Sequence, residues 1–399
     1  MRKELEKYSE YKEDNIEWIG KIPEHWNATK LKHLCVLQRG FDLPSQDRQE
    51  GQFPIYGGGG ITGYHSKAMV QPPGVVTGRY GTVGEVFLVN EPFWPLNTSL
   101  YVKEFWSNLP EFVRYVLTTL PIETYSAKAA VPGINRNIIH QLPIAIPPLF
   151  EQKAIAHYLD TKTAQIDRKI DLLTQKATLY SNLKQSLINE TVTRGLDKTA
   201  PMKDSGIEWI GEVPNHWKIK RVKELFEISR GRVIALTELV EDGHYPVYSS
   251  QTKDNGCLGY INTFDYEGEY VTWTTDGVNA GTVFMRRGQF NCTNICGTLK
   301  LKSKKQSITY FSYSLQVSTR HNKRIDTNGA KIMSNEMAFI QIVAASLSEQ
   351  EAIADYLDTK TAQIDQIIQT INTQIEKLKE LRKTLINDVV TGKIKIVDN

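Results

Sequence analysis

The segment EQKAIAHYLDTKTAQID at Glu151–Asp167 returns as EQEAIADYLDTKTAQID at Glu349–Asp365, with fifteen of seventeen positions identical. A second repeated pair lies upstream, where IEWIGKIPEHW at Ile16–Trp26 matches IEWIGEVPNHW at Ile207–Trp217 at eight of eleven positions. The members of the two pairs are 198 and 191 residues apart, so the separations differ by only seven. The chain therefore consists of two tandem copies of one unit of about 195 residues.

Length and composition agree with two compact domains. A chain of 399 residues is too long for one ordinary core and suits two domains of roughly 100 to 200 residues each. Its 40% hydrophobic and 23% charged residues are typical of a globular protein, and a net charge of +3 does not by itself indicate nucleic-acid binding. We expect no signal peptide and no membrane span, because the N-terminus lacks an apolar segment and no apolar run reaches membrane-spanning length. The four cysteines show no zinc-ligand pattern. We expect a cytoplasmic location, reduced thiols and no metal.

Each copy contains a short Trp-containing motif, a middle of about 120 residues and a long helical segment. The middles hold β-branched and aromatic runs broken by Gly and Pro, which predict strands and turns. We therefore predict mixed α/β domains at residues 1–150 and 197–348, and helical segments at 151–196 and 349–399.

The helical segments carry a narrow apolar stripe with mostly three- and four-residue spacing, which is the seam pattern of a coiled coil. Two such helices in one chain are expected to pair. A helix over Glu151–Arg194 would span roughly 66 Å, and Gly195 and Gly392 are expected to end the two helices. The stripe residues are Ile166, Ile170, Leu173, Ala177, Tyr180 and Leu187 in the first copy and Ile364, Ile368, Ile371, Ile375, Leu378 and Leu385 in the second.

The ends of the unit are nearly identical, whereas the middles align only at scattered points. This contrast indicates a shared frame with divergent surfaces. The expected equivalences are Tyr56 with Tyr248, Gly63-Tyr64 with Gly259-Tyr260, Val76-Thr77 with Val271-Thr272, and Gly84–Phe87 with Gly281–Phe284.

Motifs of common catalytic sites do not occur in the sequence. It has no Walker A loop, no GxSxG, no HExxH and no NPPY or NPPF tetrapeptide of an amino-methyltransferase. Only His25 and His216 are repeat-equivalent histidines within the Trp motifs, and we expect a structural role for both. The sequence therefore predicts a protein without a catalytic site of its own.

The repeated IEWIGxxPxHW motif, the repeated EQxAIAxYLDTKTAQID segment and the helix ends LINETVTRG (Leu187–Gly195) and LINDVVTG (Leu385–Gly392) together resemble one family. The chain resembles the specificity subunit of a type I restriction-modification system, and the resemblance extends from Ile16 to Gly392. The fold class it implies is α+β, with two pseudo-repeated mixed α/β target recognition domains separated by two long antiparallel coiled-coil spacer helices.

The resemblance also implies function. Each recognition domain would read one half of a split sequence in double-stranded DNA, and the chain would be a non-catalytic subunit. The partners implied are two methyltransferase subunits for adenine methylation and two motor-nuclease subunits for restriction. S-adenosylmethionine, ATP and Mg would then be cofactors of those partners, with none in this chain.

Base readout needs Arg, Lys, Asn or Gln at groove edges, and phosphate contacts need cations on loops. We therefore expect the DNA-binding residues in the loops of the two middles. The candidates are Arg79, Tyr80, Lys128, Asn135 and Arg136 in the first domain, and Arg230, Arg232, Lys253, Arg320, Lys323, Arg324 and Lys331 in the second.

Two neighbouring features are interpreted differently. The glycines at 57–60 are expected to serve a turn. Arg286 and Arg287 flank Gly288 in an expected hairpin tip and are left out of the candidate set.

Other interpretations stay open at this point. The helices can be a packing device and the Trp motifs a staple between domain and helix in an ordinary two-domain protein. The main functional alternative is a solitary DNA-binding or coiled-coil scaffold protein without a methyltransferase partner, which the genomic neighbourhood would distinguish. A fused restriction and methylation enzyme would need motifs that the sequence lacks.

Two departures from symmetry are also expected to matter. LPIAIPPLFEQ precedes the first helix, but the second copy has FIQIVAASLSEQ, so the two helix starts should differ. The extension Met1–Asn15 is expected to pack back on the second helix and close a ring.

Overall fold

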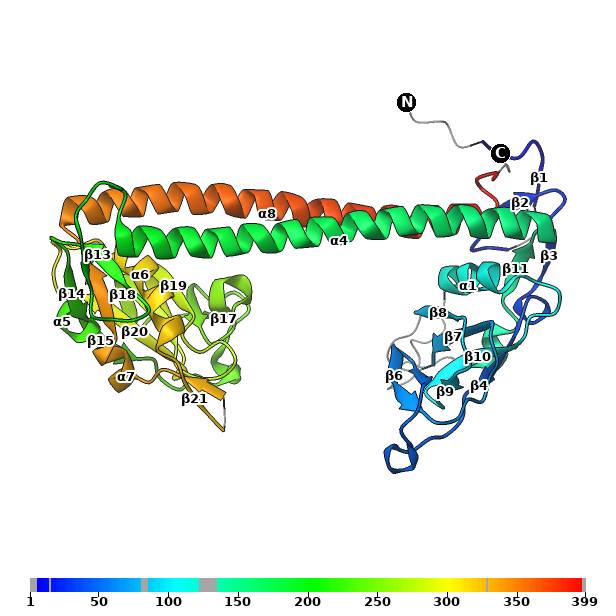
Figure 1. The fold of residues 1–399 in the computed structure, drawn as a ribbon, viewed down its shortest axis with the longest axis horizontal. Helices are drawn as coiled ribbons and strands as arrows, with labels where there is room; N and C mark the ends of the chain where they lie inside the picture. The colour runs from blue at the N-terminus through cyan, green and yellow to red at the C-terminus, as the bar shows by residue number, and fades with distance from the viewer. Residues whose placement is uncertain (1–5, 14–15, 80–84, 122–134, 328, 397–399) are drawn as a thin grey trace. The chain divides into compact units, whose positions relative to one another are not determined.

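A computed structural model describes residues 6–13, 16–79, 85–121, 135–327 and 329–396 (Figure 1). The chain divides into two compact units. Unit 1 comprises Met1–Thr174 and Thr373–Asn399, and unit 2 comprises Gln175–Asn372. Each long helix passes from one unit into the other, so a unit contains one mixed α/β domain and one half of each helix. The domain boundaries drawn at residues 150, 196 and 348 stay predictions.

Unit 1 contains a four-stranded antiparallel sheet in the order β4-β10-β7-β8 and a three-stranded sheet in the order β6-β5-β9. Strand β5 pairs antiparallel with β6 and parallel with β9. Two further strand pairs, β1-β2 and β11-β3, lie near the helix ends. The strands are β1 Tyr11–Glu13, β2 Lys21–Pro23, β3 Asn27–Lys30, β4 Val36–Arg39, β5 Phe53–Gly57, β6 Gly60–His65, β7 Gly74–Gly78, β8 Val86–Val89, β9 Trp94–Pro95, β10 Ser99–Glu104 and β11 Pro143–Ile146; the helices are η1 Leu31–His33, η2 Ser45–Asp47, α1 Pro110–Thr119 and α3 Arg136–Ile139.

Unit 2 repeats this arrangement in one six-stranded sheet, in the order β15-β20-β18-β19-β16-β17. The single long strand β19 takes the places of both β8 and β9, and it pairs parallel with β16 as β9 does with β5. The strands are β12 Met202–Asp204, β13 Glu212–Pro214, β14 Lys218–Arg221, β15 Phe226–Arg230, β16 Tyr245–Tyr248, β17 Cys257–Ile261, β18 Tyr266–Thr274, β19 Val283–Cys292, β20 Cys296–Leu301, β21 Arg324–Asp326, β22 Gly329–Lys331 and β23 Gln341–Ala344; the helices are α5 Val222–Leu225, η3 Leu236–Glu238, η4 Lys253–Gly256, α6 Ile308–His321 and α7 Ser334–Phe339.

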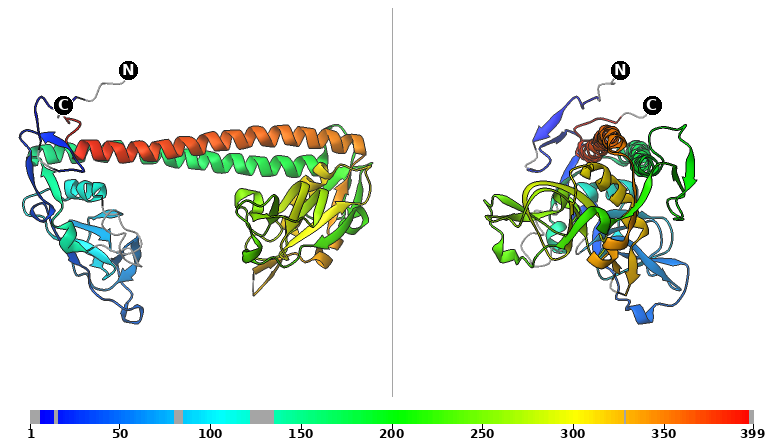
Figure 2. Two further views of the ribbon diagram at one scale, coloured as in Figure 1. Left: turned by 180° about the vertical axis from the view of Figure 1, so that it is seen from behind. Right: turned by 90° about the vertical axis from the view of Figure 1, so that its left-hand side faces the viewer.

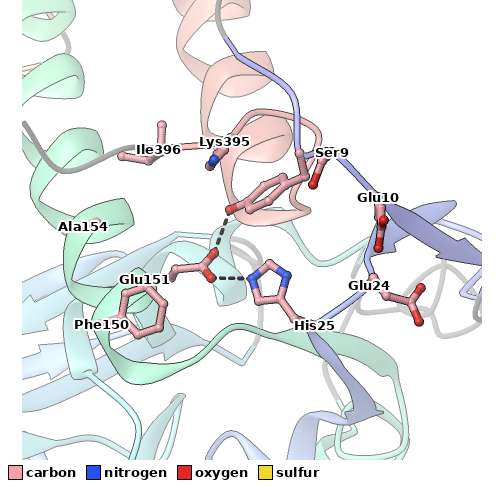
Figure 3. Close-up of a pocket in the computed structure, with 10 residues that line it drawn as sticks. Ser9, Glu10, Glu24, His25, Phe150, Glu151, Ala154, Lys395 and Ile396 are labelled. Atoms are coloured by element: carbon pink, nitrogen blue, oxygen red, sulfur yellow. Dashed lines mark hydrogen bonds and ion pairs between the residues drawn. The ribbon is translucent and has the colours of Figure 1, made fainter.

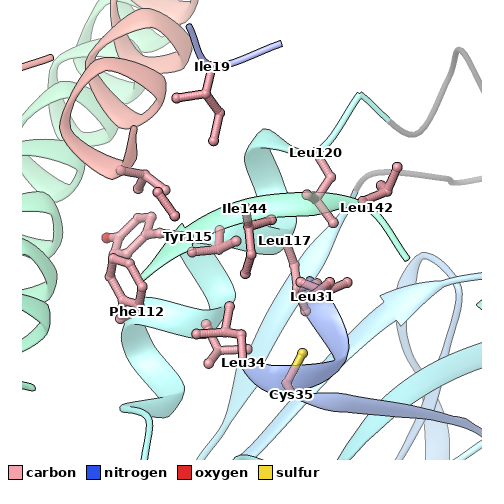
Figure 4. Packing of buried hydrophobic residues seen from close by; sticks show 14 of the residues in the cluster. Ile19, Leu31, Leu34, Cys35, Phe112, Tyr115, Leu117, Leu120, Leu142 and Ile144 are labelled. Atoms are coloured by element: carbon pink, nitrogen blue, oxygen red, sulfur yellow. The ribbon is translucent and has the colours of Figure 1, made fainter. Parts of the chain in front are cut away.

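The main core of unit 1 lies between the sheet and α1 (Figure 4). Leu31, Leu34 and Phe112 are fully buried there, and Val75 of β7 reaches the same core. The next residue, Val76, points to the other face of the sheet and packs in a smaller cluster with Tyr56. This alternation is the period of two that a strand with two covered faces requires.

The two long helices are α4 (Leu149–Arg194) and α8 (Leu347–Val390). With 46 residues, α4 is about 69 Å long. The helices run side by side and antiparallel within each unit (Figure 2). In unit 1 Arg382 Nε lies 2.9 Å from Asp167 Oδ1, and in unit 2 Lys184 Nζ lies 2.6 Å from Asp365 Oδ2.

The seam and helix ends follow the sequence prediction. The seam residues of α4 are half-buried, and Ile364, Ile371 and Ile375 of α8 are buried. Gly195, directly after α4, and Gly392, two residues after the end of α8, take positive φ values of 75° and 77°. The predicted fold class is therefore confirmed.

The N-terminal extension packs beside the end of α8, as expected, for the residues that are described. The backbone N–H of Lys395 donates to Glu6 O over 2.8 Å, and the Tyr11 hydroxyl donates to Gly392 O over 3.2 Å. Closure of a ring stays a prediction. No described helix has the apolar length that crossing a bilayer requires.

Two sequence interpretations are wrong. Arg286 and Arg287 do not flank a hairpin tip, because Gly288 pairs with Gly268 in the middle of the β18-β19 ladder. The pairing register also shifts one equivalence by a residue. Val75-Val76, not Val76-Thr77, corresponds to Val271-Thr272, because Val76 pairs with Phe87 where Thr272 pairs with Phe284.

Candidate nucleic-acid interface

A group of loop segments forms one contiguous surface of unit 2, at residues 230–232, 249–256, 275–281, 293–295, 324–327 and 329–331. Backbone hydrogen bonds connect them: Thr293 N donates to Tyr248 O over 2.9 Å, and Thr275 N donates to Ile295 O over 2.9 Å. Gly277 N donates to Ala330 O over 3.1 Å, which joins the 275–281 loop to the β21-β22 hairpin. We call these segments the unit 2 loop group.

Six of the seven predicted residues of unit 2 lie on or beside the loop group, and four of them lie in or beside its 249–256 loop or its β21-β22 hairpin. Lys253 is exposed in the 249–256 loop, and Lys331 forms an isolated β-bridge with Asp276. Lys323 is exposed beside the hairpin and near Gly281. Arg324 begins the hairpin, and its Nε donates to Glu336 Oε1 over 2.7 Å. Cations from separate parts of the sequence are therefore brought together.

The other three unit 2 candidates, all arginines, differ in their hydrogen-bond and ion-pair partners. Arg232 forms ion pairs with Glu238 and Asp265, each over 3.0 Å, and the hydrogen bond with Glu238 is the main cause of a raised pKa for this guanidinium. Arg230 donates to the carbonyl of Asn294. Arg320 is exposed in the last turn of α6. An arginine held by two carboxylates is less available to phosphate than an arginine without carboxylate partners.

The first domain is described at three of its five predicted positions. Arg79 follows β7, and its backbone N–H donates to Thr98 O over 3.0 Å. Asn135 caps α3 by accepting from Asn137 N over 3.0 Å, which gives its side chain a structural role. Arg136 is exposed in the same short helix. Tyr80 and Lys128 lie outside the described residues. As predicted, the glycines at 57–60 form the turn between β5 and β6.

A glutamate at the start of each long helix accepts a hydrogen bond from the tryptophan of a Trp motif. The sequence analysis did not predict this contact. Glu151 accepts from Tyr8 over 2.8 Å and pairs with His25 (Figure 3). It also accepts from Trp26 Nε1 over 3.0 Å. A cavity of about 550 Å³ opens beside this cluster, lined also by Phe150 and Lys395. The signal was present, because Glu151 and His25 are identical to their counterparts in the second copy.

The second copy uses the same carboxylate with different partners. Glu349 accepts from Trp217 over 3.0 Å and lies 2.8 Å from His216 Nε2. Ser346, which replaces a proline of the first copy, donates its hydroxyl to Glu349 over 2.7 Å. Burial opposes ionisation, but these hydrogen bonds outweigh it and lower the pKa of Glu349 to about 2. The expected difference between the two helix starts is thus confirmed.

The repeated EQxAIAxYLDTKTAQID segment has an aspartate, identical in both copies, that docks each long helix on its own domain. Tyr115 of α1 donates to Asp160 over 2.7 Å, and Tyr313 of α6 donates to Asp358 over 2.6 Å. Burial raises the pKa of Tyr115 to about 12. Repeat identity at these positions is therefore explained by intramolecular packing.

Other identical residues of that segment are exposed in both copies. They are Thr161, Ala164 and Gln165 in α4, with Thr359, Ala362 and Gln363 in α8. Packing within the described part of the chain does not account for their identity. We call these six residues the repeated helix surface.

The comparisons with known proteins place the chain in one family. The family model of the type I restriction modification DNA specificity domain matches residues 23–177 and 214–377, one match in each copy. A type I restriction enzyme specificity subunit of Methanocaldococcus jannaschii is 22% identical over 97% of both chains. Another from Mycoplasma pneumoniae is 37% identical over 40% of this chain and 48% of the relative.

A solved structure supports the fold. Its description is the structural basis underlying complex assembly and conformational transition of the type I R-M system. The matched chain has a TM-score of 0.68 and 13% identity, and the match covers 92% of this chain and 98% of that one. Because the family model covers both copies, the chain belongs to the type I restriction-modification specificity subunits, which are non-catalytic components of these systems.

Proposed function

We propose that the chain reads a bipartite target in double-stranded DNA, one half-site per domain, and recruits methyltransferase subunits for adenine methylation. Motor-nuclease subunits would join the same assembly for restriction. The observation that carries the proposal is the division of each copy into a nearly identical frame and a divergent loop surface. A partner that binds both copies in the same way requires the shared frame. Recognition of two different half-sites requires the divergent loop surfaces.

The unit 2 loop group supports DNA reading by its chemistry. Lys253 and Lys323 are exposed there, and exposed cations on loops suit contacts to phosphates. Asn255 supplies an exposed amide group of the kind that pairs with base edges. A surface of this composition combines positioning contacts with sequence-reading contacts.

The repeated helix surface supports the recruitment of two copies of one partner. Its residues are exposed and identical in α4 and α8, so the same partner surface would meet the same side chains twice. Two methyltransferase subunits are the partners that this pseudo-symmetry suits. The cofactors S-adenosylmethionine, ATP and Mg would be held by those partner chains, and the complex would act on the DNA of the host cytoplasm.

The test uses the purified full chain and a type I methyltransferase subunit from the source organism. Mixing the two should give a complex that transfers methyl groups from S-adenosylmethionine to plasmid DNA, at adenines of one split sequence. The methyltransferase alone should give no sequence-specific transfer. Specific DNA binding by the chain without any complex would instead support a solitary DNA-binding protein.

A further inference from the structure

The turn between two equivalent strand pairs differs in length between the copies. In unit 1 the four residues 57–60 separate Tyr56 from its pairing partner Ile61. In unit 2 the eight residues 249–256 separate Tyr248 from its partner Cys257. The rest of the ladder keeps its register, since Ile55 pairs with Gly63 where Val247 pairs with Gly259. Unit 2 therefore carries a longer loop on the same frame.

A buried arginine lies directly beneath this longer loop. Arg286 of β19 is only 2% exposed. Its Nη1 donates to Asn255 O over 2.8 Å, and its Nε donates to Thr272 Oγ1 over 3.1 Å. The guanidinium carbon also lies 3.5 Å from the ring centroid of Tyr248. Arg286 thus connects the loop backbone to the sheet.

The first copy has a hydrophobic pair at the same two sheet positions. The ladder register places Val89 where unit 2 has Arg286, and Val76 where it has Thr272. Val76 and Val89 are both buried in the small cluster around Tyr56. The polar pair therefore occurs in the copy that has the longer loop.

The loop backbone has a conformation that needs support. Asp254 and Asn255 have φ values of 48° and 53°, in the left-handed region that Asp and Asn tolerate better than most residues. Gly256 has φ 81°, and a Cβ there would lie 3.0 Å from Arg286 Nη2. The loop thus closes tightly over the guanidinium.

Burying a guanidinium costs free energy unless hydrogen bonds and packing compensate for it. A hydrophobic pair fills the equivalent site in unit 1, so the fold itself does not need a cation there. What Arg286 adds is a fixed path for the loop, whose residues 252–255 are exposed. Preorganised contacts bind more tightly than mobile ones because less ordering entropy is lost.

We propose that Arg286 is a positioning residue that holds the 249–256 loop as a DNA-reading element of the second domain. This inference rests on the proposed function. Lys253 would then contact DNA from a loop with a fixed backbone, and the half-site read by unit 2 would depend on Arg286 without any contact between that arginine and DNA.

The experiment maps adenine methylation in the source genome by single-molecule sequencing for chromosomal variants of the gene. The test variant combines Thr272→Val with Arg286→Val, which installs the valine pair of the first copy. The control is Arg287→Met. Arg287 is the next residue of β19, but its side chain is 64% exposed and pairs with Glu269 over 3.0 Å.

The double variant should relax or lose the bases of one half-site, with methylation at the original sites falling by roughly tenfold. The other half-site should be unchanged, and Arg287→Met should match the wild type. A folded double variant with the wild-type motif and methylated fraction would overturn the inference.

Thermal unfolding of the purified chain checks that the double variant folds. If it does not, Lys253→Ala tests the loop alone: a lower methylated fraction at the original sites supports the inference, and an unchanged motif with an unchanged methylated fraction overturns it. Failure of the proposed function looks different, because deletion of the wild-type gene would then leave the methylation map unchanged.

Discussion

Glu151 and Glu349 occupy equivalent positions in the two copies but have partly different hydrogen-bond partners. Both carboxylates accept a hydrogen bond from the tryptophan of a Trp motif at the start of a long helix. The first adds a tyrosine hydroxyl from the N-terminal extension, and the second adds Ser346 of its own helix cap. The Trp motif therefore connects the domain to the long helix through a side-chain hydrogen bond, as the interpretation as a staple expects.

A pH dependence follows from the lowered pKa of Glu349. Its pKa falls from 4.5 to about 2, so its contribution to stability is fully present above about pH 4.5 and is lost as the pH falls through about 2. The side chain is 35% exposed, and solvent screening limits the effect to about 1 kcal/mol, or roughly 2–4 °C. Glu349→Gln should lower the thermal midpoint by this amount at pH 6.

Thermal unfolding of both proteins between pH 6 and pH 2 measures the effect. The difference between wild type and variant should shrink toward pH 2. A difference that stays constant over the range would contradict the assignment.

At this scale the sequence predicts less than the structure contains. The repeat-equivalent His25 and His216 are rightly expected to be structural, but their glutamate partners lie more than a hundred positions away and periodicity does not indicate them. The ion pairs of Arg232 and Arg324 are also invisible in the sequence, because loop geometry brings their carboxylates close. The residue type and sequence position of a cationic side chain do not indicate which carboxylate it pairs with.

Among the elements, α8 shows how narrow the buried stripe of the long helices is. Ile371 is 4% exposed in the seam, whereas Ile367, one turn earlier, is 38% exposed. The two residues have the same chemistry and propensity and differ in burial alone. They therefore form a matched pair for testing the seam.

Ile371→Ala should lower the free energy of unfolding by about 2–4 kcal/mol, because it removes buried methyl groups and leaves a cavity. Ile367→Ala should change it by about 0.5 kcal/mol or less. Urea unfolding followed by circular dichroism measures both values. Equal effects of the two substitutions would show that the seam does not stabilise the helix pair.

The long helices are predicted well because their period extends over many turns and glycines mark their ends. The strands are predicted as a class, but their registers are not. Glycine commonly marks a turn, so the sequence predicts a hairpin tip at Gly288, yet Gly288 pairs with Gly268 and the ladder continues. The same prediction puts Arg286 at the tip, although this residue is buried in the sheet. The position of Gly288 in the ladder and the burial of Arg286 both depend on pairing between separate strands. A local sequence pattern does not indicate that pairing.

For the whole molecule, the repeated helix surface predicts where a shared partner binds. Ala164→Arg with Ala362→Arg places a long cation on each exposed site with little cost in helix propensity. This double variant should weaken methyltransferase binding by about tenfold or more, since a buried unpaired charge is costly at an interface.

Ser186→Arg with Thr384→Arg is the control. Both positions are exposed on the same helices, but they differ between the copies. Pull-down of the methyltransferase by each purified chain gives the comparison. Equal binding by the two double variants would remove the repeated helix surface as the docking site.

The central claim is that this chain selects a split DNA sequence for adenine methylation. Its most direct test is a single-molecule methylation map of the source genome with the gene intact and with the gene deleted. The account predicts that deletion removes methylation from one bipartite motif, with a modified adenine in each half. Identical maps, with the gene expressed in the intact strain, would contradict it.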